Sequence, residues 1–237
     1  MAIERVSSAR FFLTPGHDCG YFDDREAATL LLDPAEAPSN GTYGTLSEAG
    51  FRRGGPHIYR PHCIRCRACV PTRVPVDRFR WNRRFRRIDR RNADTEKRVE
   101  PAEFREEHYD LYARYIEGRH ADGSMYPPSR AQFRSFLLAP WSRTLFLCTY
   151  LDGALAAVAV TDVLPDALSA IYTYFDPALP RRSLGVYSIL HQIEECRRRR
   201  LAHLYLGFWI EDAPKMRYKT DFRPVELLEG GRWAEMT

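Results

Sequence analysis

The segment APKMRYKTDF, residues 213–222, contains two of the three lysines in a chain that has 33 arginines. A lysine ammonium is compact and sits on a slim stem, so it fits beside a phosphate, a ribose hydroxyl or a carboxylate where a planar guanidinium does not. Lys215 and Lys219 are four residues apart, and a helical turn would place them on one face with Tyr218 beside them. We expect Lys219 and Tyr218 to border a reaction centre; the alternative is a surface turn after a core strand.

Four cysteines form a second group with the potential for chemistry. Cys63, Cys66 and Cys69 follow a C-x2-C-x2-C pattern, and Cys19 lies 44 residues upstream of Cys63. Four thiolates suit zinc or an iron–sulfur cluster, and the tight triple spacing resembles a cluster loop more than a zinc finger. Spacing does not show that the four thiols converge, so four reduced cysteines packed beside strands are the alternative.

Arginines crowd the segment RFRWNRRFRRIDRRN, residues 78–92, where aromatic side chains stand between them. Guanidinium groups neutralise phosphates and aromatic rings stack on bases, so this composition is typical of an RNA-binding surface. Trp81, Phe85 and Ile88 fit one face of a helix, and we expect them to pack on the protein. The arginines then stay free to bind RNA, chiefly Arg83, Arg84 and Arg87.

The chain divides near residue 100 by the kind of element that each part predicts. Upstream, short apolar runs are punctuated by Pro and Gly, which indicates short strands in an irregular, loop-rich unit. These predicted strands are residues 11–13, 29–33, 57–59 and 70–76. We expect a Cys-containing domain with the basic segment over residues 1–100 and a second domain over residues 101–237.

Downstream, longer elements predict a layered α/β domain. Residues 101–120 predict a helix with Pro101 in its first turn and a buried stripe of tyrosines. A three-stranded meander, a helix capped by Ser183 and a returning parallel strand follow. These elements cover residues 144–151, 154–163, 167–175, 183–200 and 201–208. Their order resembles the acyltransferase fold of the GNAT superfamily, a mixed sheet flanked by helices.

The helix entry LPRRSLG is a candidate phosphate site. Backbone N–H groups at the positive end of a helix bind anions, and Arg181 and Arg182 precede this end. Together with Ser183 and Gly185 they could hold the phosphate of an acyl carrier, which binds at the corresponding helix in the GNAT fold. Many helices start with Ser after a basic turn, so the motif by itself leaves the ligand open.

Composition and charge restrict the class of protein. Of the 237 residues, 44% are hydrophobic, which suffices for folded cores. No run approaches the roughly 18 apolar residues of a membrane helix, and the first residues, MAIERVSSARFF, lack the apolar stretch of a signal peptide. We expect a cytoplasmic monomer without membrane contact. Its net charge is only +5, but its clustered arginines favour an anionic partner, nucleic acid above all.

Five segments spread over almost the whole chain carry a resemblance to a known family. They are HDCGY, GFRRGGPHIYRPHCIRCRACVPTRVPVDRF, RHADGSM, SLGVYSIL and YLGFWIEDAPKMRYKTDFRPVELLEGGRW. The last is the most specific, with Tyr205, Gly207, Lys215, Met216, Tyr218, Lys219, Phe222 and Pro224 placed as in the family pattern. Together these segments resemble the arginyl-tRNA-protein transferase family, and more closely its short bacterial branch of leucyltransferases.

The resemblance implies transfer of an amino acid from aminoacyl-tRNA to the N-terminal Asp or Glu of a protein, which marks that protein for degradation. We expect Tyr205, Tyr218 and Lys219 to form the catalytic group and Lys215 to contact the tRNA. The short length and the cysteine triple favour leucyl-tRNA over arginyl-tRNA as donor. Eukaryotic members carry C-G-Y-C and an adjacent Cys-Cys pair, whereas Phe22 replaces the second of these cysteines here, so a metal cluster stays an open alternative.

The chemistry of such a transfer requires no cofactor. An α-amine attacks an ester that is already reactive, so positioning should dominate. An amine with a pKa of about 7.7–8.0 is partly neutral in the cytoplasm, and a weak base suffices. Arg60, Arg73, Arg119 and His120 are candidates to hold the acceptor carboxylate, although Arg119 and His120 would also suit the end of a helix.

Two other functions fit parts of the sequence. An acetyl-CoA-dependent N-acetyltransferase would share the predicted C-terminal topology, but it needs neither the basic segment nor the N-terminal unit. A non-catalytic RNA-binding or metal-sensing protein would use the arginines and cysteines, but it leaves the C-terminal segment unexplained. The carrier that the protein accepts, charged tRNA or acetyl-CoA, distinguishes the two enzymes.

Overall fold

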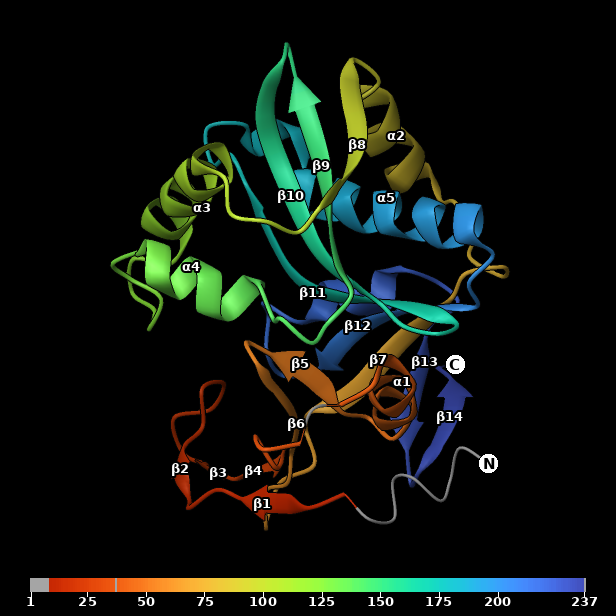
Figure 1. Ribbon diagram of the computed structural model, residues 1–237. Helices are drawn as coiled ribbons and strands as arrows, with labels where there is room; N and C mark the ends of the chain where they lie inside the picture. The colour runs from red at the N-terminus through yellow and green to blue at the C-terminus, as the bar shows by residue number, and fades with distance from the viewer. Residues whose placement is uncertain (1–8, 37, 237) are drawn as a thin grey trace.

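The computed structural model describes residues 9–36 and 38–236. Figure 1 shows a twisted central sheet with helices on both faces, and a smaller unit of N-terminal elements below it. The central sheet has eight strands in the order β14-β13-β7-β12-β11-β10-β9-β8. The mixed α/β class that the sequence predicts, a mixed sheet flanked by helices, is confirmed.

The centre of the sheet follows the predicted order of elements. Strands β9, β10 and β11 form an antiparallel meander, and β12 pairs parallel to β11 after the helix α5. Their bounds are β9 Thr144–Leu151, β10 Ala154–Val163, β11 Ala167–Phe175, α5 Leu184–Arg199 and β12 His203–Trp209. Asp152 and Gly153, with φ of 50° and 80°, close the first hairpin as a type I′ turn requires. The predicted meander, helix and parallel strand are therefore confirmed.

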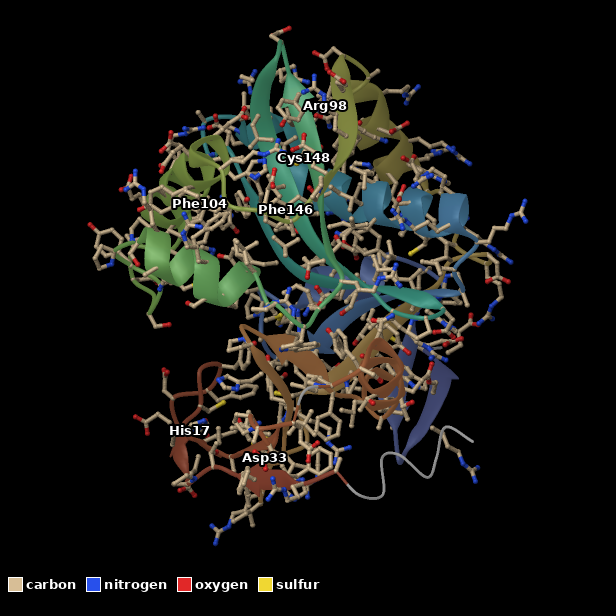
Figure 2. All side chains as sticks on the ribbon, viewed as in Figure 1. His17, Asp33, Arg98, Phe104, Phe146 and Cys148 are labelled. Atoms are coloured by element: carbon tan, nitrogen blue, oxygen red, sulfur yellow. The ribbon has the colours of Figure 1, made fainter. Side chains whose placement is uncertain are left out.

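Each face of the sheet is covered by a pair of helices with its own apolar core. On one face lie α3 (Glu106–Arg119) and α4 (Arg130–Leu137), with Phe133, Phe146 and Cys148 buried between them and the sheet. Figure 2 labels Phe104, Phe146 and Cys148 in this region. On the other face, α2 (Arg83–Arg91) packs with α5, and Phe85 and Ile88 are buried. The tyrosine stripe of α3 is core, as predicted.

Two details of the predicted helices are wrong. Pro101 does not begin a helix, because it is the last residue of the edge strand β8 (Thr95–Pro101), which pairs with β9; α3 begins only at Glu106. An edge strand tolerates proline, since its N–H side can face away from the neighbouring strand. Trp81 lies before the first residue of α2 and so is not part of that helix, but it packs against the same core as Phe85 and Ile88, as predicted.

The N-terminal unit consists of short elements around a four-stranded sheet with the order β1-β4-β6-β5. All four predicted strands upstream of residue 100 are confirmed, within one or two residues at their ends. The bounds are β1 Phe11–Leu13, β2 His17–Asp18, β3 Glu26–Ala27, β4 Thr29–Leu32, α1 Asn40–Glu48, β5 Arg52–Gly54, β6 His57–Pro61 and β7 Val70–Pro75. Downstream of β12 follow η2 Arg217–Asp221, β13 Glu226–Glu229 and β14 Arg232–Glu235, and η1 Pro180–Arg182 precedes α5.

The central sheet contains strands from both sides of residue 100. Strand β7 lies between β12 and β13, and β8 forms the far edge. A second link is a fully buried ion pair, in which the Arg53 guanidinium of β5 donates to both carboxylate oxygens of Asp162 on β10, at 2.7 and 3.0 Å. The N-terminal unit is thus anchored to the sheet, and the division into two domains at residue 100 stays a prediction.

The helices of the described residues do not include one with the length and apolar character of a membrane span. The prediction that the first residues contain no signal peptide falls mainly on residues 1–8, which lie outside the described part of the chain.

Candidate active site

Neighbouring strands β11 and β12 separate at a pair of irregularities. Their parallel pairing runs only through Ala167–Ser169 and His203–Tyr205. Beyond it, Ile171 is an extra residue in the register of β11 with β10, and Leu206 is an extra residue in the register of β12 with β7. Bulges bend a strand and increase its twist, and they are common beside active sites. The result is a local split in the centre of the sheet.

Lys219 lies against β12 at this split. It is only 3% exposed, and its Nζ donates to the backbone carbonyl of Phe208 and lies 3.2 Å from the sulfur of Met216. Burial, and next the charge of Arg52, lower the pKa of Lys219 from 10.5 to about 7, while Cys69 acts in the opposite direction. A substantial share of Lys219 is therefore an uncharged amine at neutral pH, as proton transfer from a substrate requires.

Tyr218 and Arg52 lie next to Lys219. Nζ of Lys219 is 6.0 Å from the centre of the Tyr218 ring. Tyr218 is 39% exposed, yet burial of its hydroxyl raises the pKa of this group, and the charge of Arg52 opposes the shift. Arg52 comes from β5 of the N-terminal unit, so two segments far apart in sequence meet at this point.

The C-terminal end of α3 continues the site on the side of Tyr218. The ring nitrogen Nε2 of His120 is 3.2 Å from the hydroxyl of Tyr115. Burial, then the charges of Lys215 and Arg119, lower the pKa of His120, so its imidazole is neutral at neutral pH. Burial raises the pKa of Tyr115, and ionisation of Tyr218 would raise it further, so the two hydroxyls lie near each other. The structure thus brings His120, Arg119 and Lys215 together near Tyr218.

Lys215 and Lys219 do not share the face of a helical turn, so that prediction is wrong. The segment folds as the short 3₁₀ helix η2, which begins after Lys215; Lys215 is exposed while Lys219 is buried. The 3₁₀ helix has three residues per turn rather than 3.6, and Lys215 precedes it, so the i, i+4 argument does not apply.

Phe175 links this cluster to the predicted phosphate site. Its ring lies 4.9 Å from that of Tyr115 and 6.0 Å from the guanidinium of Arg119. A Cβ at Gly185, in the first turn of α5, would lie 3.2 Å from the same ring. We call the connected set the basic–aromatic row. It consists of Arg52, Tyr115, Arg119, His120, Phe175, Lys215, Tyr218 and Lys219.

The entry of α5 differs from its prediction in one respect. Ser183 occupies the N-cap position, but it is left-handed with φ 55° and its side chain accepts no capping hydrogen bond, so the predicted side-chain cap is wrong. The first N–H groups of α5 are consequently not capped by this hydroxyl. Arg182 forms an ion pair with Asp94 at 2.7 Å, and Arg91 at the end of α2 donates to the carbonyl of Arg181.

The arginine-rich helix α2 therefore ends beside the entry of α5. Arg83, Arg84 and Arg87 all lie on its exposed side, and the guanidinium of Arg84 forms an ion pair with Asp221 of η2. The arginines are exposed while Phe85 and Ile88 are buried, which is the division predicted from the sequence, but Arg84 is not free because of its ion pair. The exposed arginines run along α2, whose last residue contacts the α5 entry.

Three predicted site residues are engaged elsewhere. Arg73 donates to Glu226 at 2.8 Å and to Glu48 at 2.7 Å, and Tyr205 donates to the same Glu48 at 2.7 Å. Burial, then the hydrogen bond to Glu48, raises the pKa of Tyr205 far above 10. Arg60 lies over the ring of Phe51, 4.8 Å from its centre, and donates to the carbonyl of Ala49. The structure groups these side chains around α1, but Tyr205 also lines a narrow crevice together with Arg52 of the basic–aromatic row.

Comparison with known proteins gives two matches that together cover most of the chain. A family model described as the N terminus of arginine-tRNA-protein transferase matches residues 17–87, and the C-terminus model of the same family matches residues 107–229. The chain belongs to this family. The elements that meet at the split, β5, β11, β12 and η2, all lie within the matched residues of the transferase.

Curated relatives of this transferase are similar over nearly their full length. A protein named aspartate/glutamate leucyltransferase from Alcanivorax borkumensis is 53% identical over 98% of this chain and 96% of its own. One of the same name from Chromohalobacter salexigens is 54% identical over 94% and 92%. Among solved structures, L-PGS from Bacillus licheniformis covers 60% of this chain and 46% of its own, at 11% identity and a TM-score of 0.45.

The four cysteines of the transferase lie near one another and near the site. Burial raises the pKa of Cys69 to about 11, and the charges of Cys63, Cys19 and Cys66 act in the same direction. The pKa of Cys66 is lowered by an N–H of Ala68 and by Arg25, whose Nη1 is 3.5 Å from its sulfur. All four are half-buried free thiols, a ligand set whose chemistry fits zinc or an iron–sulfur cluster.

Within the described residues, no three of these four sulfur atoms lie within 4.8 Å of one another. Groups of three or more ligand atoms within 4.8 Å of one another occur there in two places, and they consist of Glu100, His108 and Cys148, and of Glu48, Asp166 and His203. Neither group includes a member of the cysteine quartet. We derive no step of the transfer from a metal, and metal binding by the quartet stays a proposal.

Arg52 is the main residue of the site that the sequence does not reveal by itself. It lies in the family segment GFRRGG, where two neighbouring arginines look equivalent. Alternation along a strand sends them to opposite sides: Arg53 to the buried Asp162, Arg52 to the split between β11 and β12. Recognition of this segment as a short strand would have separated their roles.

Proposed function

We propose that this protein transfers leucine from leucyl-tRNA to the N-terminal Asp or Glu of acceptor proteins. The observation that carries the proposal is the buried Lys219, whose pKa of about 7 places an uncharged amine at the split in the sheet, at one end of the basic–aromatic row. The other end of the row is the entry of α5, where a helix N-terminus and two arginines suit a phosphate. The aminoacylated 3′ end of a tRNA would extend from the α5 entry to Lys219.

In this proposal, the protein binds the donor tRNA through the backbone phosphates of the RNA, and aromatic rings of the protein position it. Arg83, Arg84 and Arg87 contact the tRNA along α2, and Arg181 and Arg182 with the N–H groups of Ser183 and Gly185 hold a phosphate near its 3′ end. Lys215 is exposed beside His120 and is suited to the last phosphates or the terminal ribose. Such contacts fix the register of the RNA without reading its sequence.

Leucine as the donor amino acid is supported by the charge of the row and by the names of the relatives. The row contains the cations Arg52, Arg119 and Lys215, which would repel an arginyl side chain placed next to them. The partly exposed ring of Phe175, 4.9 Å from the buried ring of Tyr115, offers an apolar surface that suits a leucyl side chain. The relatives at 53% and 54% identity are named aspartate/glutamate leucyltransferases.

The acidic acceptor is held by cations in this proposal. Arg119 is exposed at the end of α3, next to His120 and within the same row as Lys219. A guanidinium binds a carboxylate with two parallel hydrogen bonds, which would favour Asp and Glu over their amides. Arg73 is already bonded to two carboxylates, so we assign it to holding α1 and β13 against β7 rather than to the acceptor.

The reaction needs one base and one site for negative charge. The uncharged Lys219 accepts a proton from the attacking α-amine, and Tyr218 beside it orients the amine through its hydroxyl. No covalent enzyme intermediate and no cofactor is required, because the ester is already activated. As a partner the protein requires only aminoacyl-tRNA and the acceptor protein, and we propose that it acts as a cytoplasmic monomer.

The test mixes the purified protein with a peptide that begins with Asp and, in separate reactions, leucyl-tRNA, arginyl-tRNA or acetyl-CoA, and measures the added mass. We expect a leucine adduct on the α-amine of the Asp peptide. The matched peptide that begins with Asn should react at least about tenfold more slowly, because it lacks the charge that a guanidinium recognises. An arginine adduct would keep the mechanism and change the donor, and an acetyl adduct or no adduct would refute the proposal.

A further inference from the structure

The split between β11 and β12 is filled by one side chain from another part of the molecule. Strand β5 lies against these strands (Figure 1), and Nη2 of Arg52 donates to the carbonyls of Ala170 and Ile171, at 2.9 and 3.0 Å. Ile171 is the extra residue of the β11 bulge. The bulge therefore turns two adjacent carbonyls toward one guanidinium, which fixes the orientation of that group.

The opposite wall of the split makes room for the same guanidinium. Gly207 follows the bulge of β12 and has φ 79°, and a Cβ at this position would overlap Nη1 of Arg52. A residue without a side chain is thus required on both steric and conformational grounds. A narrow crevice opens here, lined by Arg52, Ser169, Tyr205, Gly207 and Phe208 among others. This crevice has a volume of about 10 Å³, which is room for about one oxygen-sized atom beside Arg52.

The hydrogen bonds of Arg53 fix the backbone of strand β5. Arg53, the next residue, is 1% exposed; its guanidinium binds Asp162 with two hydrogen bonds and also donates to the carbonyls of Gly55 and Phe136. Asp162 in turn accepts from the hydroxyl of Tyr43 at 3.0 Å. Preorganisation of a charged group requires such a rigid support, because a mobile cation loses part of its effect.

Only part of the hydrogen-bonding capacity of Arg52 is used by the protein. Nη2 makes both of the bonds described above, and within residues 9–36 and 38–236 neither Nη1 nor Nε has an acceptor. Titratable groups face Arg52 from several elements: Lys219 and Tyr218 of η2, Tyr21, Tyr43 of α1, Tyr59 of β6 and Tyr205 of β12. A fixed cation with an unused donor therefore lies beside the amine of Lys219.

We propose that Arg52 is a further catalytic residue of the transfer, whose Nη1 donates to the oxyanion that forms on the aminoacyl carbonyl. This inference rests on the proposed function. The acceptor nitrogen forms a bond to the ester carbonyl carbon, and the π electrons of the carbonyl move to its oxygen. Lys219 takes one proton from the nitrogen. When the oxyanion collapses, the bond to the ribose oxygen breaks, and this oxygen leaves with the proton from Lys219.

Arg52 stabilises the intermediate more than the ester, because the negative charge exists only after the attack. A donor that acts on such a charge affects kcat and leaves substrate binding nearly unchanged. Lysine at position 52 would keep the charge but lose the fork that holds both carbonyls. Glutamine would lose the charge as well, so the two variants separate charge from orientation.

The test measures kcat for the wild type, Arg52→Lys and Arg52→Gln, and the Kd of an unreactive amide-linked leucyl-tRNA analogue for each. Loss of one oxyanion donor typically reduces kcat by about 10²–10³-fold. We expect a loss of this size for Arg52→Gln, a smaller one for Arg52→Lys, and Kd values within about threefold of the wild type. The matched control is Arg197→Gln, because Arg197 also donates to two backbone carbonyls, those of Val76 and Phe79, but far along α5 from the split.

Each outcome decides the inference. A kcat of Arg52→Gln within about threefold of the wild type, or a loss equal to that of Arg197→Gln, would overturn the role of Arg52 while leaving the proposed function intact. A Kd that weakens in parallel with kcat/KM at constant kcat would overturn it too, since Arg52 would then be a binding residue. No leucyl transfer by the wild type would overturn both the proposed function and this inference.

Discussion

Replacement of Lys219 by methionine should abolish transfer and at the same time stabilise the protein at neutral pH. The pKa of Lys219 is lowered from 10.5 to about 7 by its burial. Each pKa unit corresponds to about 1.4 kcal/mol, so the charged form costs about 5 kcal/mol in the folded state at or below pH 7. Methionine removes this cost but also the hydrogen bond to the Phe208 carbonyl, worth about 1 kcal/mol, and leaves that carbonyl unpaired. We expect a net stabilisation of about 2–4 kcal/mol.

The dependence of this gain on pH tests the reasoning without any assumption about packing. Between about pH 7 and 10 the unfolded wild type keeps the Lys219 proton that the folded wild type has lost, so wild-type stability rises by about 1.4 kcal/mol per pH unit relative to the variant. The advantage of Lys219→Met should therefore be constant below about pH 6.5 and shrink steadily above pH 7.5. Cys69 interacts with Lys219, but its pKa of about 11 lies above this range of pH, and groups remote from Lys219 titrate alike in both proteins and cancel in the difference.

Urea unfolding of wild type and Lys219→Met at about pH 6, 7.5, 8.5 and 9.5 measures this difference directly. Lys215→Met is the matched control above about pH 7.5, because it makes the same substitution at an exposed lysine, without the burial that gives Lys219 its slope. A pH-independent difference for Lys219→Met would refute the lowered pKa. Transfer by Lys219→Met at a rate near that of the wild type would remove Lys219 from the reaction centre.

Three further predictions concern the surroundings of the site. Asp162→Ala should lower the free energy of unfolding by about 3–5 kcal/mol in urea titrations, because it leaves the buried guanidinium of Arg53 unpaired; a loss below about 1 kcal/mol would contradict this. Gly207→Ala should destabilise the fold by at least about 1 kcal/mol and reduce kcat as Arg52→Gln does, and unchanged kcat would show that Arg52 can move without consequence. Arg182→Glu should raise the KM for leucyl-tRNA about tenfold with little effect on kcat, whereas a KM that stays the same would exclude the α5 entry from tRNA binding.

Local patterns in the sequence sufficed for most of the elements. The apolar runs of β9, β10 and β11, the Asp152-Gly153 turn and the helical spacing in α5 each satisfy a rule that depends only on near neighbours in the chain. One of the local rules failed because of a distant segment. Pro101 looked like a helix start, but pairing of residues 95–101 with β9 makes it the end of a strand.

The chemistry of the site divides in the same way. The sequence by itself determined that a lysine-poor, arginine-rich chain retains Lys215 and Lys219 beside Tyr218, and its segments determined the family. Only the tertiary structure decided that Lys219 is buried and Lys215 exposed, and that Arg52 rather than Arg53 enters the split. The pKa of an amine and the orientation of a guanidinium depend on which segments exclude water around them. Here those segments are β5, β12 and η2, which come together only when the chain folds.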